Sequence, residues 1–163
     1  MPGNHLEDLV AEIYELRGYF VRRNVLVGPR LRGGYECELD IVAFHPGLRN
    51  LVHIEPSLDT ESWENRERRF SKKFDAGRKY IPKLFEGSKL PRKIEQIALF
   101  VYGGGGRTTL AGGRVMFIKD FMFEIMEELY SNWRHLKNKA IPEGYPLLRT
   151  LQMAVEYWRV LDR

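Results

Sequence analysis

Two carboxylates, Asp40 and Glu55, lie inside consecutive apolar runs, YECELDIVAF and NLVHIEPS, which are typical of strands. The Pro-Gly turn between the runs predicts a hairpin. If Phe44 pairs with Leu51, strand alternation puts Asp40 directly opposite Glu55, with Cβ atoms about 5 Å apart. Two like charges at that distance repel by roughly 3 kcal/mol at an effective dielectric constant of 20.

A neutralising group is therefore expected near this pair: a shared proton, an arginine or a metal ion. Clustered carboxylate oxygens suit Mg²⁺ or Mn²⁺. The alternative is the exposed polar face of an edge hairpin, in which lysine or arginine side chains balance each acid.

The same alternation brings further polar side chains to the acids. Glu38 shares the face of Asp40 and is expected opposite Ser57, while His53 shares the face of Glu55. Each is a candidate for a further ligand or a supporting group. Glu38 as a solvent-exposed acid and His53 as a packed side chain are the alternatives. On the opposite face of the first strand we expect Cys37, Leu39, Ile41 and Ala43.

The elements that position these residues follow from hydrophobic periodicity and turn signals. We expect helices over 5–17 (with Asn4 as N-cap), 61–85, from Asp120 to about His135, and from Pro146 onward, and strands over 19–27, 35–44, 50–57, 94–103 and 114–118, with a flexible glycine-rich loop before the last strand. This order predicts an α/β protein, a mixed sheet flanked by helices with extra C-terminal helices. A single domain, 1–163, is expected, with a core of about 4–118 and a helical part of about 119–163.

Composition narrows the function classes. Hydrophobic residues are 44% and charged residues 29%, which is typical of a soluble globular protein. No apolar run is long enough for a membrane span, and the polar N-terminus does not resemble a signal peptide. Cys37 is the single cysteine, which excludes a disulfide within the chain and a Cys-rich zinc site and favours a cytoplasmic location. The net charge of +4 is compatible with a nucleic-acid partner.

Three segments together resemble the PD-(D/E)XK superfamily, the restriction-endonuclease-like nucleases. They are HLEDLVAEIYELRGYFV, ELDIVAF and LVHIEPS, and the resemblance spans roughly residues 4–102. It is greatest to the branch that contains the Holliday-junction resolvases and the Mrr-like restriction enzymes. Glu7, with Glu12 as the alternative, matches the family's helix glutamate, Asp40 its metal-binding aspartate, and Glu55 the acid of the (D/E)XK motif.

The resemblance implies a Mg²⁺- or Mn²⁺-dependent endonuclease that hydrolyses phosphodiester bonds in DNA. It implies metal ligation by Asp40, Glu55, Glu7 and the carbonyl of Pro56. Cations near the site would contact the nucleic acid; the candidates are Arg22, Arg23, Arg30 and Arg32. Many members of this branch form dimers, and the C-terminal helices, with Trp133 and Trp158, are a candidate homodimer surface.

Ser57 departs from the family pattern, which has lysine at this position to offset charge on the phosphate. Lys73 is a candidate substitute, because it lies on the inward stripe of the predicted helix 61–85, between Phe70 and Gly77. The alternative is a lysine whose stem only covers apolar surface. Without a lysine at the acids, the chain would be a catalytically weakened or inactive nucleic-acid-binding protein on the same fold. A third possibility is an interaction module with no nucleic-acid role.

Overall fold

The computed structural model describes residues 4–133 and 139–161, with side chains up to residue 157 in the last helix. In chain order its elements are α1 (His5–Leu16), β1 (Phe20–Pro29), β2 (Tyr35–His45), β3 (Asn50–Ser57), α2 (Trp63–Leu84), β4 (Glu95–Phe100), β5 (Thr109–Leu110), β6 (Gly113–Phe117), α3 (Ile118–Asn132) and α4 (Pro146–Leu161). The strands form one sheet in the order β1-β2-β3-β4-β6-β5. The β3–β4 and β4–β6 pairs are parallel and the other pairs antiparallel, so the expected mixed α/β sheet with C-terminal helices is confirmed.

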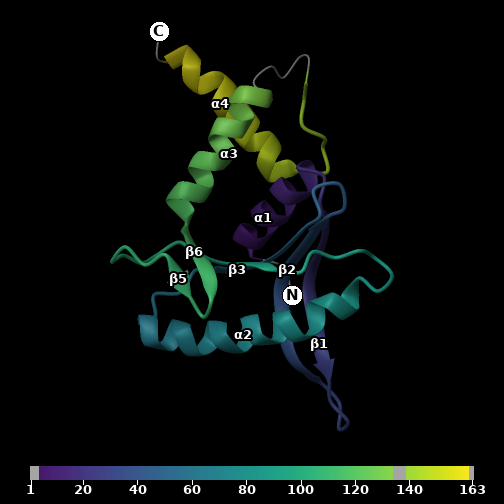
Figure 1. The fold of residues 1–163 in the computed structure, drawn as a ribbon. Coiled ribbons are helices and arrows are strands. Elements are labelled where there is room, and N and C mark those ends of the chain that lie inside the picture. The colour runs from purple at the N-terminus through teal and green to yellow at the C-terminus, as the bar shows by residue number, and fades with distance from the viewer. Residues whose placement is uncertain (1–3, 134–138, 162–163) are drawn as a thin grey trace.

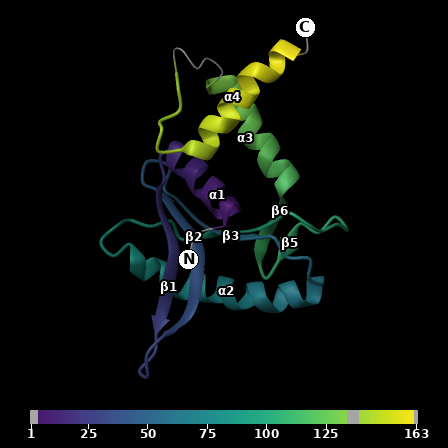
Figure 2. The same ribbon diagram turned by 180° about the vertical axis from the view of Figure 1, so that it is seen from behind.

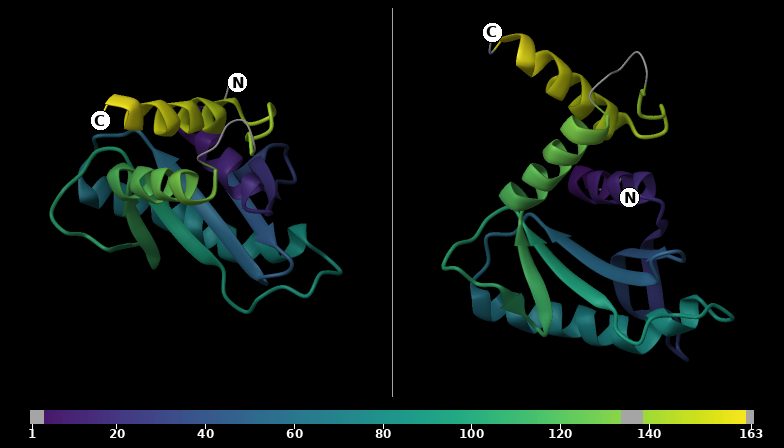
Figure 3. Two further views of the ribbon diagram at one scale, coloured as in Figure 1. Left: turned by 90° about the horizontal axis from the view of Figure 1, so that it is seen from above. Right: turned by 45° about the horizontal axis from the view of Figure 1, so that its top comes forward.

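Helices cover both faces of the sheet. Helix α2 runs across one face, and α1 lies on the other, with α3 and α4 stacked beyond it (Figures 1 and 2). The tilted view shows the same layers, and the view from above shows the strands fanned out behind α3 and α4 (Figure 3). The β1–β2 ribbon continues past the sheet and ends in a narrow tip beyond the α2 layer (Figure 1).

Each face has its own hydrophobic core. On the α1 side one cluster joins α1, the sheet, α3 and α4, and includes Val10, Ile54 and Leu129. On the α2 side two clusters lie beneath the long helix, one around Phe74 and one around Ile81. The central strands are therefore buried from both sides, which accounts for their nearly continuous apolar sequences.

The register of the predicted hairpin is confirmed. Phe44 pairs with Leu51, and the pairing runs inward as far as Ile41 with Ile54. The prediction that Leu39 and Ile41 share a face is wrong: Leu39 packs in the α2-side cluster and Ile41 in the α1-side cluster. The strand alternation is interrupted between them, at Asp40. On the neighbouring strand Asn24 has a positive φ of 50°, so both strands of the ribbon change face at this level.

Several elements in the second half of the sheet differ from prediction, and β4 ends at Phe100 rather than at residue 103. The glycine-rich loop before β6 contains the short strand β5, since Leu110 is buried and a two-residue Ala111-Gly112 turn with both φ values positive joins it to β6. Asp120 is not the cap of the following helix. The N-cap of α3 is Phe117, and Asp120 lies in the first turn, where its charge complements the helix dipole.

The C-terminal helices pack onto α1. Trp133, a predicted dimer residue, is half-buried against the α1-side cluster, while the side chain of Trp158 and residue His135 lie outside the described residues. The homodimer stays a prediction. Within the described residues, no helix combines the length and apolarity that a membrane crossing needs.

Candidate active site

The structure brings Lys73 to the two carboxylates. Its Nζ lies 2.7 Å from Asp40 Oδ1 and also contacts Glu55 Oε2, so one ammonium group bridges acids from β2 and β3. Lys73 reaches them from α2 because helical spacing places it on the side that faces the sheet, next to the buried Phe74. A lysine of the chain, which was not among the neutralising groups expected from the acid pair alone, therefore neutralises the acids.

Strands β2 and β3 stop pairing at the position of the two acids. Pairing of β2 with β3 ends at Ile41 and Ile54, and beyond that point the backbone N–H of Asp40 donates to Glu55 Oε1 at 3.1 Å. A side chain thus takes the place of a strand carbonyl. Pro56, which has no N–H to donate, lies in the unpaired part of this edge, which is why a central strand tolerates it.

A buried chain of hydrogen bonds supports Glu55 from behind. His53 is 0% exposed, and its Nε2 lies 2.7 Å from Glu55 Oε1. Its Nδ1 lies 3.0 Å from Gln96 Nε2, and the Gln96 amide also donates to the carbonyl of Phe74 at 2.9 Å. Since an amide nitrogen only donates, Nδ1 accepts and Nε2–H donates to Glu55. Glu55 Oε1 is therefore held by two donors, while Oε2 faces Lys73.

Gly77 allows α2 to approach this chain closely. A Cβ at this position would lie 2.7 Å from His53 Cε1 and 3.0 Å from Gln96 Nε2. These distances are too short for a real side chain, so the missing methyl group lets the helix descend onto His53. One turn before it, the same helix supplies Lys73, and the close approach brings that lysine within reach of the acids.

The electrostatics fit a cluster that holds one extra proton or cation. Burial and then the charge of Glu55 together raise the pKa of Asp40 to about 7, against the opposing effect of Lys73. Burial also raises the pKa of Glu55. Burial opposes the charge on Lys73, but Glu55 and Asp40 outweigh it and raise the lysine pKa. His53 is kept neutral, because burial lowers its pKa to about 3.

The two candidate glutamates of α1 have different environments. Glu7 is half-buried, and its pKa is raised by burial and then by the charge of Asp40, which places it in the field of the acid pair. Glu12 is buried and caps another helix instead: its carboxylate accepts from the backbone N–H groups of Leu148, at 2.9 Å, and Leu147, at 3.3 Å. Of the two, Glu7 is the one near the site.

Ser57, in the motif lysine position, belongs to a neighbouring polar cluster. Its hydroxyl donates to Asp59 and accepts from Arg69 at 3.1 Å. Arg69 also forms an ion pair with Asp59. Arg66, 2% exposed, donates to Asp59 Oδ1 and to the carbonyl of Tyr102, both at 2.8 Å. Burial acts against the charge of Asp59, but the hydrogen bonds from Ser57, Arg66 and Arg69 hold its pKa well below its usual range.

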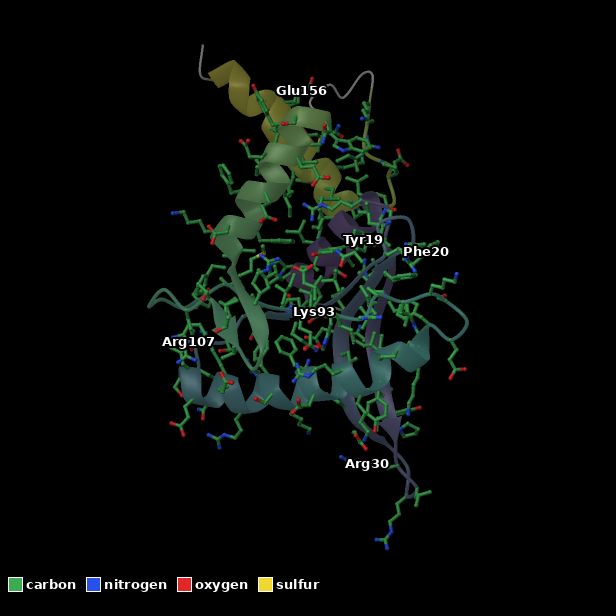
Figure 4. All side chains as sticks on the ribbon, viewed as in Figure 1. Tyr19, Phe20, Arg30, Lys93, Arg107 and Glu156 are labelled. Carbon is green, nitrogen blue, oxygen red and sulfur yellow. The ribbon has the colours of Figure 1, made fainter. Side chains whose placement is uncertain are left out.

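The predicted nucleic-acid cations do not converge on the acids. Arg23 is paired with Asp8 of α1 at 2.5 Å. Arg30 and Arg32 lie exposed at the tip of the β1–β2 ribbon, and Figure 4 shows Arg30 there, far from the opposite end of β1 at Phe20. Arg22 is exposed on β1, and Glu38, also exposed, pairs with Leu26 of β1 rather than with Ser57.

Three functional neighbours were missed from the sequence: Gln96, Arg69 and Arg66. Each meets its partner across a gap of 7 to 43 residues. Arg66 and Arg69 stood in a run of charges that is typical of a solvated helix face. Arg66 and Arg69 are three residues apart and so lie on one face of α2, and this spacing is the signal in the sequence that both could contact one acid, Asp59.

The donor set fits a divalent cation that keeps part of its water shell. Asp40 and Glu55 supply hard oxygens, and Mg²⁺ is commonly held by one or two carboxylates with water and substrate phosphate completing its sphere. Within residues 4–133 and 139–157, no group of three or more His, Cys, Asp or Glu side chains is arranged to hold an ion alone. A two-carboxylate site is the arrangement the residues allow. No protein-family model matches this chain, and no curated protein matches its sequence.

Proposed function

We propose that this chain is a metal-dependent endonuclease that hydrolyses phosphodiester bonds in DNA on a restriction-endonuclease-like fold. The observation that carries the proposal is the contact of Lys73 with both Asp40 and Glu55. It supplies an acid, acid and lysine set even though Ser57 stands at the motif's lysine position. The helix, strand hairpin, helix and strand that frame this set agree with the resemblance seen in the sequence.

Asp40 and Glu55 would hold Mg²⁺ or Mn²⁺, with Glu7 and the carbonyl of Pro56 as further candidate ligands. When bound, the ion supplies a Lewis acid for the phosphate and lowers the pKa of a water molecule. Two donors fix Glu55 Oε1, and this fixes the direction in which Oε2 presents its lone pairs.

Lys73 supplies positive charge close to the phosphate oxygens, on which negative charge grows during the reaction. Its raised pKa keeps the amine protonated at neutral pH. A phosphate that enters between Lys73 and the carboxylates would take up part of the ammonium's hydrogen bonding, and the lysine would offset the negative charge that grows on the phosphate oxygens.

One observation favours a second candidate, a nucleic-acid-binding protein with weakened or absent catalysis. The ammonium of Lys73 already bridges both carboxylates and occupies the position between them. If the lysine holds that position in the presence of metal, the acids are neutralised without an ion.

The test is nicking of supercoiled plasmid with Mg²⁺ or Mn²⁺, together with calorimetric titration of Mn²⁺. The Asp40→Asn and Glu55→Gln proteins are compared with Glu86→Gln, which changes an exposed acid outside the site. Metal-dependent nicking that is lost in the first two variants and kept in the third supports the nuclease. Nucleic-acid binding without nicking or Mn²⁺ uptake in the unmodified protein supports the second candidate.

A further inference from the structure

A groove adjoins the acid and lysine cluster. It has a volume of about 410 Å³ and runs between α2 and the β1–β2 ribbon. Lys73 lines this groove and also contacts Asp40 and Glu55, so the groove adjoins the candidate active site through this lysine.

The helix wall of the groove is basic. Arg69, Lys72 and Lys73 lie at spacings of three and four, which puts them on one side of α2. Arg69 touches Ser57 and is paired with Asp59, and Lys73 is paired with the acids. Among the described residues Lys72 makes no ion pair, so its charge is open to an anion.

The ribbon wall combines apolar and acidic side chains. Leu26 is 50% exposed and Tyr35 48% exposed, and the half-buried Cys37 lies between them along the wall. Two acids also line it: Glu36 is paired with Lys79 of α2, and Glu38 is exposed. The groove therefore has an exposed aromatic ring, an aliphatic side chain and two acids on one wall and three cations on the other, and the ring and the cations suit a ligand with a flat apolar part and a phosphate.

We propose that this groove binds one nucleotide of an unpaired strand, next to the phosphate that is cleaved. Tyr35 contacts the base, and Lys72 with Arg69 contacts its phosphate. Stacking on aromatic side chains combined with a basic path for the backbone is the usual way proteins bind single strands. The inference rests on the proposed nuclease function, and it selects a substrate class: single-stranded DNA or a strand end that leaves its duplex.

A continuous duplex does not fit these walls. It presents phosphates and the edges of its base pairs to a protein, whereas the base faces are covered by stacking. A groove built only for duplex backbone would need cations on both sides, but here one side carries Tyr35 and Leu26. The experiment must therefore distinguish binding of a single strand from binding of an intact duplex.

The experiment measures fluorescence anisotropy of a labelled oligothymidine and of a matched duplex in EDTA, so that binding is independent of metal and of cleavage. We expect Tyr35→Ala to weaken oligothymidine binding about tenfold and to leave duplex binding unchanged. Tyr35→Phe should retain binding. Phe20→Ala is the control, since it removes a 68%-exposed ring at the other end of β1, outside the groove (Figure 4).

Lys72→Ala tests the basic wall separately. It should weaken oligothymidine binding and reduce the dependence of log affinity on log salt concentration by about one unit. Equal losses for oligothymidine and duplex in Tyr35→Ala, or no loss for either, would overturn the groove assignment, provided that the variant's melting temperature matches that of the unmodified protein.

Failure of the two proposals can be told apart. Plasmid nicking that needs Asp40 while Tyr35→Ala binds oligothymidine normally refutes the groove and leaves the nuclease intact. Tyr35-dependent binding of oligothymidine without cleavage in Mg²⁺ or Mn²⁺ refutes the nuclease and supports a single-strand-binding role for the same groove.

Discussion

Lys73 Nζ lies 2.7 Å from Asp40 Oδ1, although 33 residues separate them in the chain. The contact joins the middle of α2 to the point where β2 and β3 diverge, and the same amine reaches Glu55. The lysine that contacts the acid pair is thus carried by the helix, whereas Ser57, two residues after Glu55 on the strand, contacts Asp59 and Arg69.

Replacing Lys73 by alanine is expected to lower the rate of plasmid cleavage about 10²- to 10³-fold, because it removes the charge that offsets the transition state. Mn²⁺ affinity should be kept or increased, since the competing ammonium is gone. Lys83→Ala is the control, an exposed lysine on the same helix outside the site. Equal activity in the Lys73 and Lys83 variants would refute the role of Lys73.

Returning the lysine to the strand tests the same idea from the other side. We expect the double variant Ser57→Lys/Lys73→Ala to recover at least tenfold of the activity lost in Lys73→Ala, because position 57 lies two residues after Glu55 on β3 and shares its strand face. The single variant Ser57→Ala should change the rate little, as the serine hydroxyl contacts Asp59 and Arg69 rather than the acids. No recovery in the double variant, in a folded protein, would mean that only the α2 position serves the reaction.

The pKa of Asp40 predicts how stability depends on pH without metal. In the folded state this pKa is about 7, against 3.8 for the ordinary side chain, mainly because the carboxyl is buried. The folded state therefore keeps a proton that the unfolded chain releases, and the associated stability is present below about pH 4 and lost as the pH rises through 7. Asp40→Asn should remove this dependence and be more stable at pH 8 by on the order of 2 kcal/mol.

Urea denaturation in EDTA at pH 5 and pH 8 measures this effect, with Glu86→Gln as the exposed control. The free energy of unfolding of Asp40→Asn minus that of the unmodified protein should grow between the two pH values. A difference that is the same at both would show that the Asp40 carboxyl does not titrate in this range in the folded state.

The hairpin and its acids were predictable because strand alternation and a Pro-Gly turn allow few registers, and the pairing of Phe44 with Leu51 followed from them. The inward position of Lys73 followed from helical spacing alone. Strand alternation and helical spacing are both local patterns, and local patterns can be read from a single sequence.

The change of face at Asp40 was not predictable. It coincides with a positive φ at Asn24 on the neighbouring strand, and although asparagine adopts this conformation more readily than most residues, one asparagine in a strand does not predict it. The chain from Gln96 through His53 to Glu55 was missed for a different reason. It joins β4 to β3 at a separation of 43 residues, and no periodicity within either strand indicates the contact.

Gly77 is the position where the support behind Glu55 can be disturbed without touching the acids. A helix-interior Gly→Ala change normally stabilises by about 1 kcal/mol. Here the added Cβ would press on His53 and Gln96, so Gly77→Ala is expected to destabilise by about 1–3 kcal/mol and to lower Mn²⁺ affinity as Glu55 loses its fixed orientation. Gly104→Ala, at a glycine with open space around its Cβ position, should stay within about 0.5 kcal/mol. Urea denaturation and calorimetry measure both, and a stabilised Gly77→Ala would contradict the close packing.

The two glutamates of α1 should separate metal binding from stability. Glu12 accepts from two N–H groups in the first turn of α4, so Glu12→Ala is expected to cost about 1–2 kcal/mol of unfolding free energy and to leave Mn²⁺ affinity unchanged. Glu7 lies in the field of Asp40, so Glu7→Gln should lower Mn²⁺ affinity about tenfold or more while changing stability little. Each variant serves as the control for the other in the same urea and Mn²⁺ titrations. If Glu12→Ala weakened Mn²⁺ binding and Glu7→Gln did not, the helix glutamate of the site would have to be reassigned to Glu12.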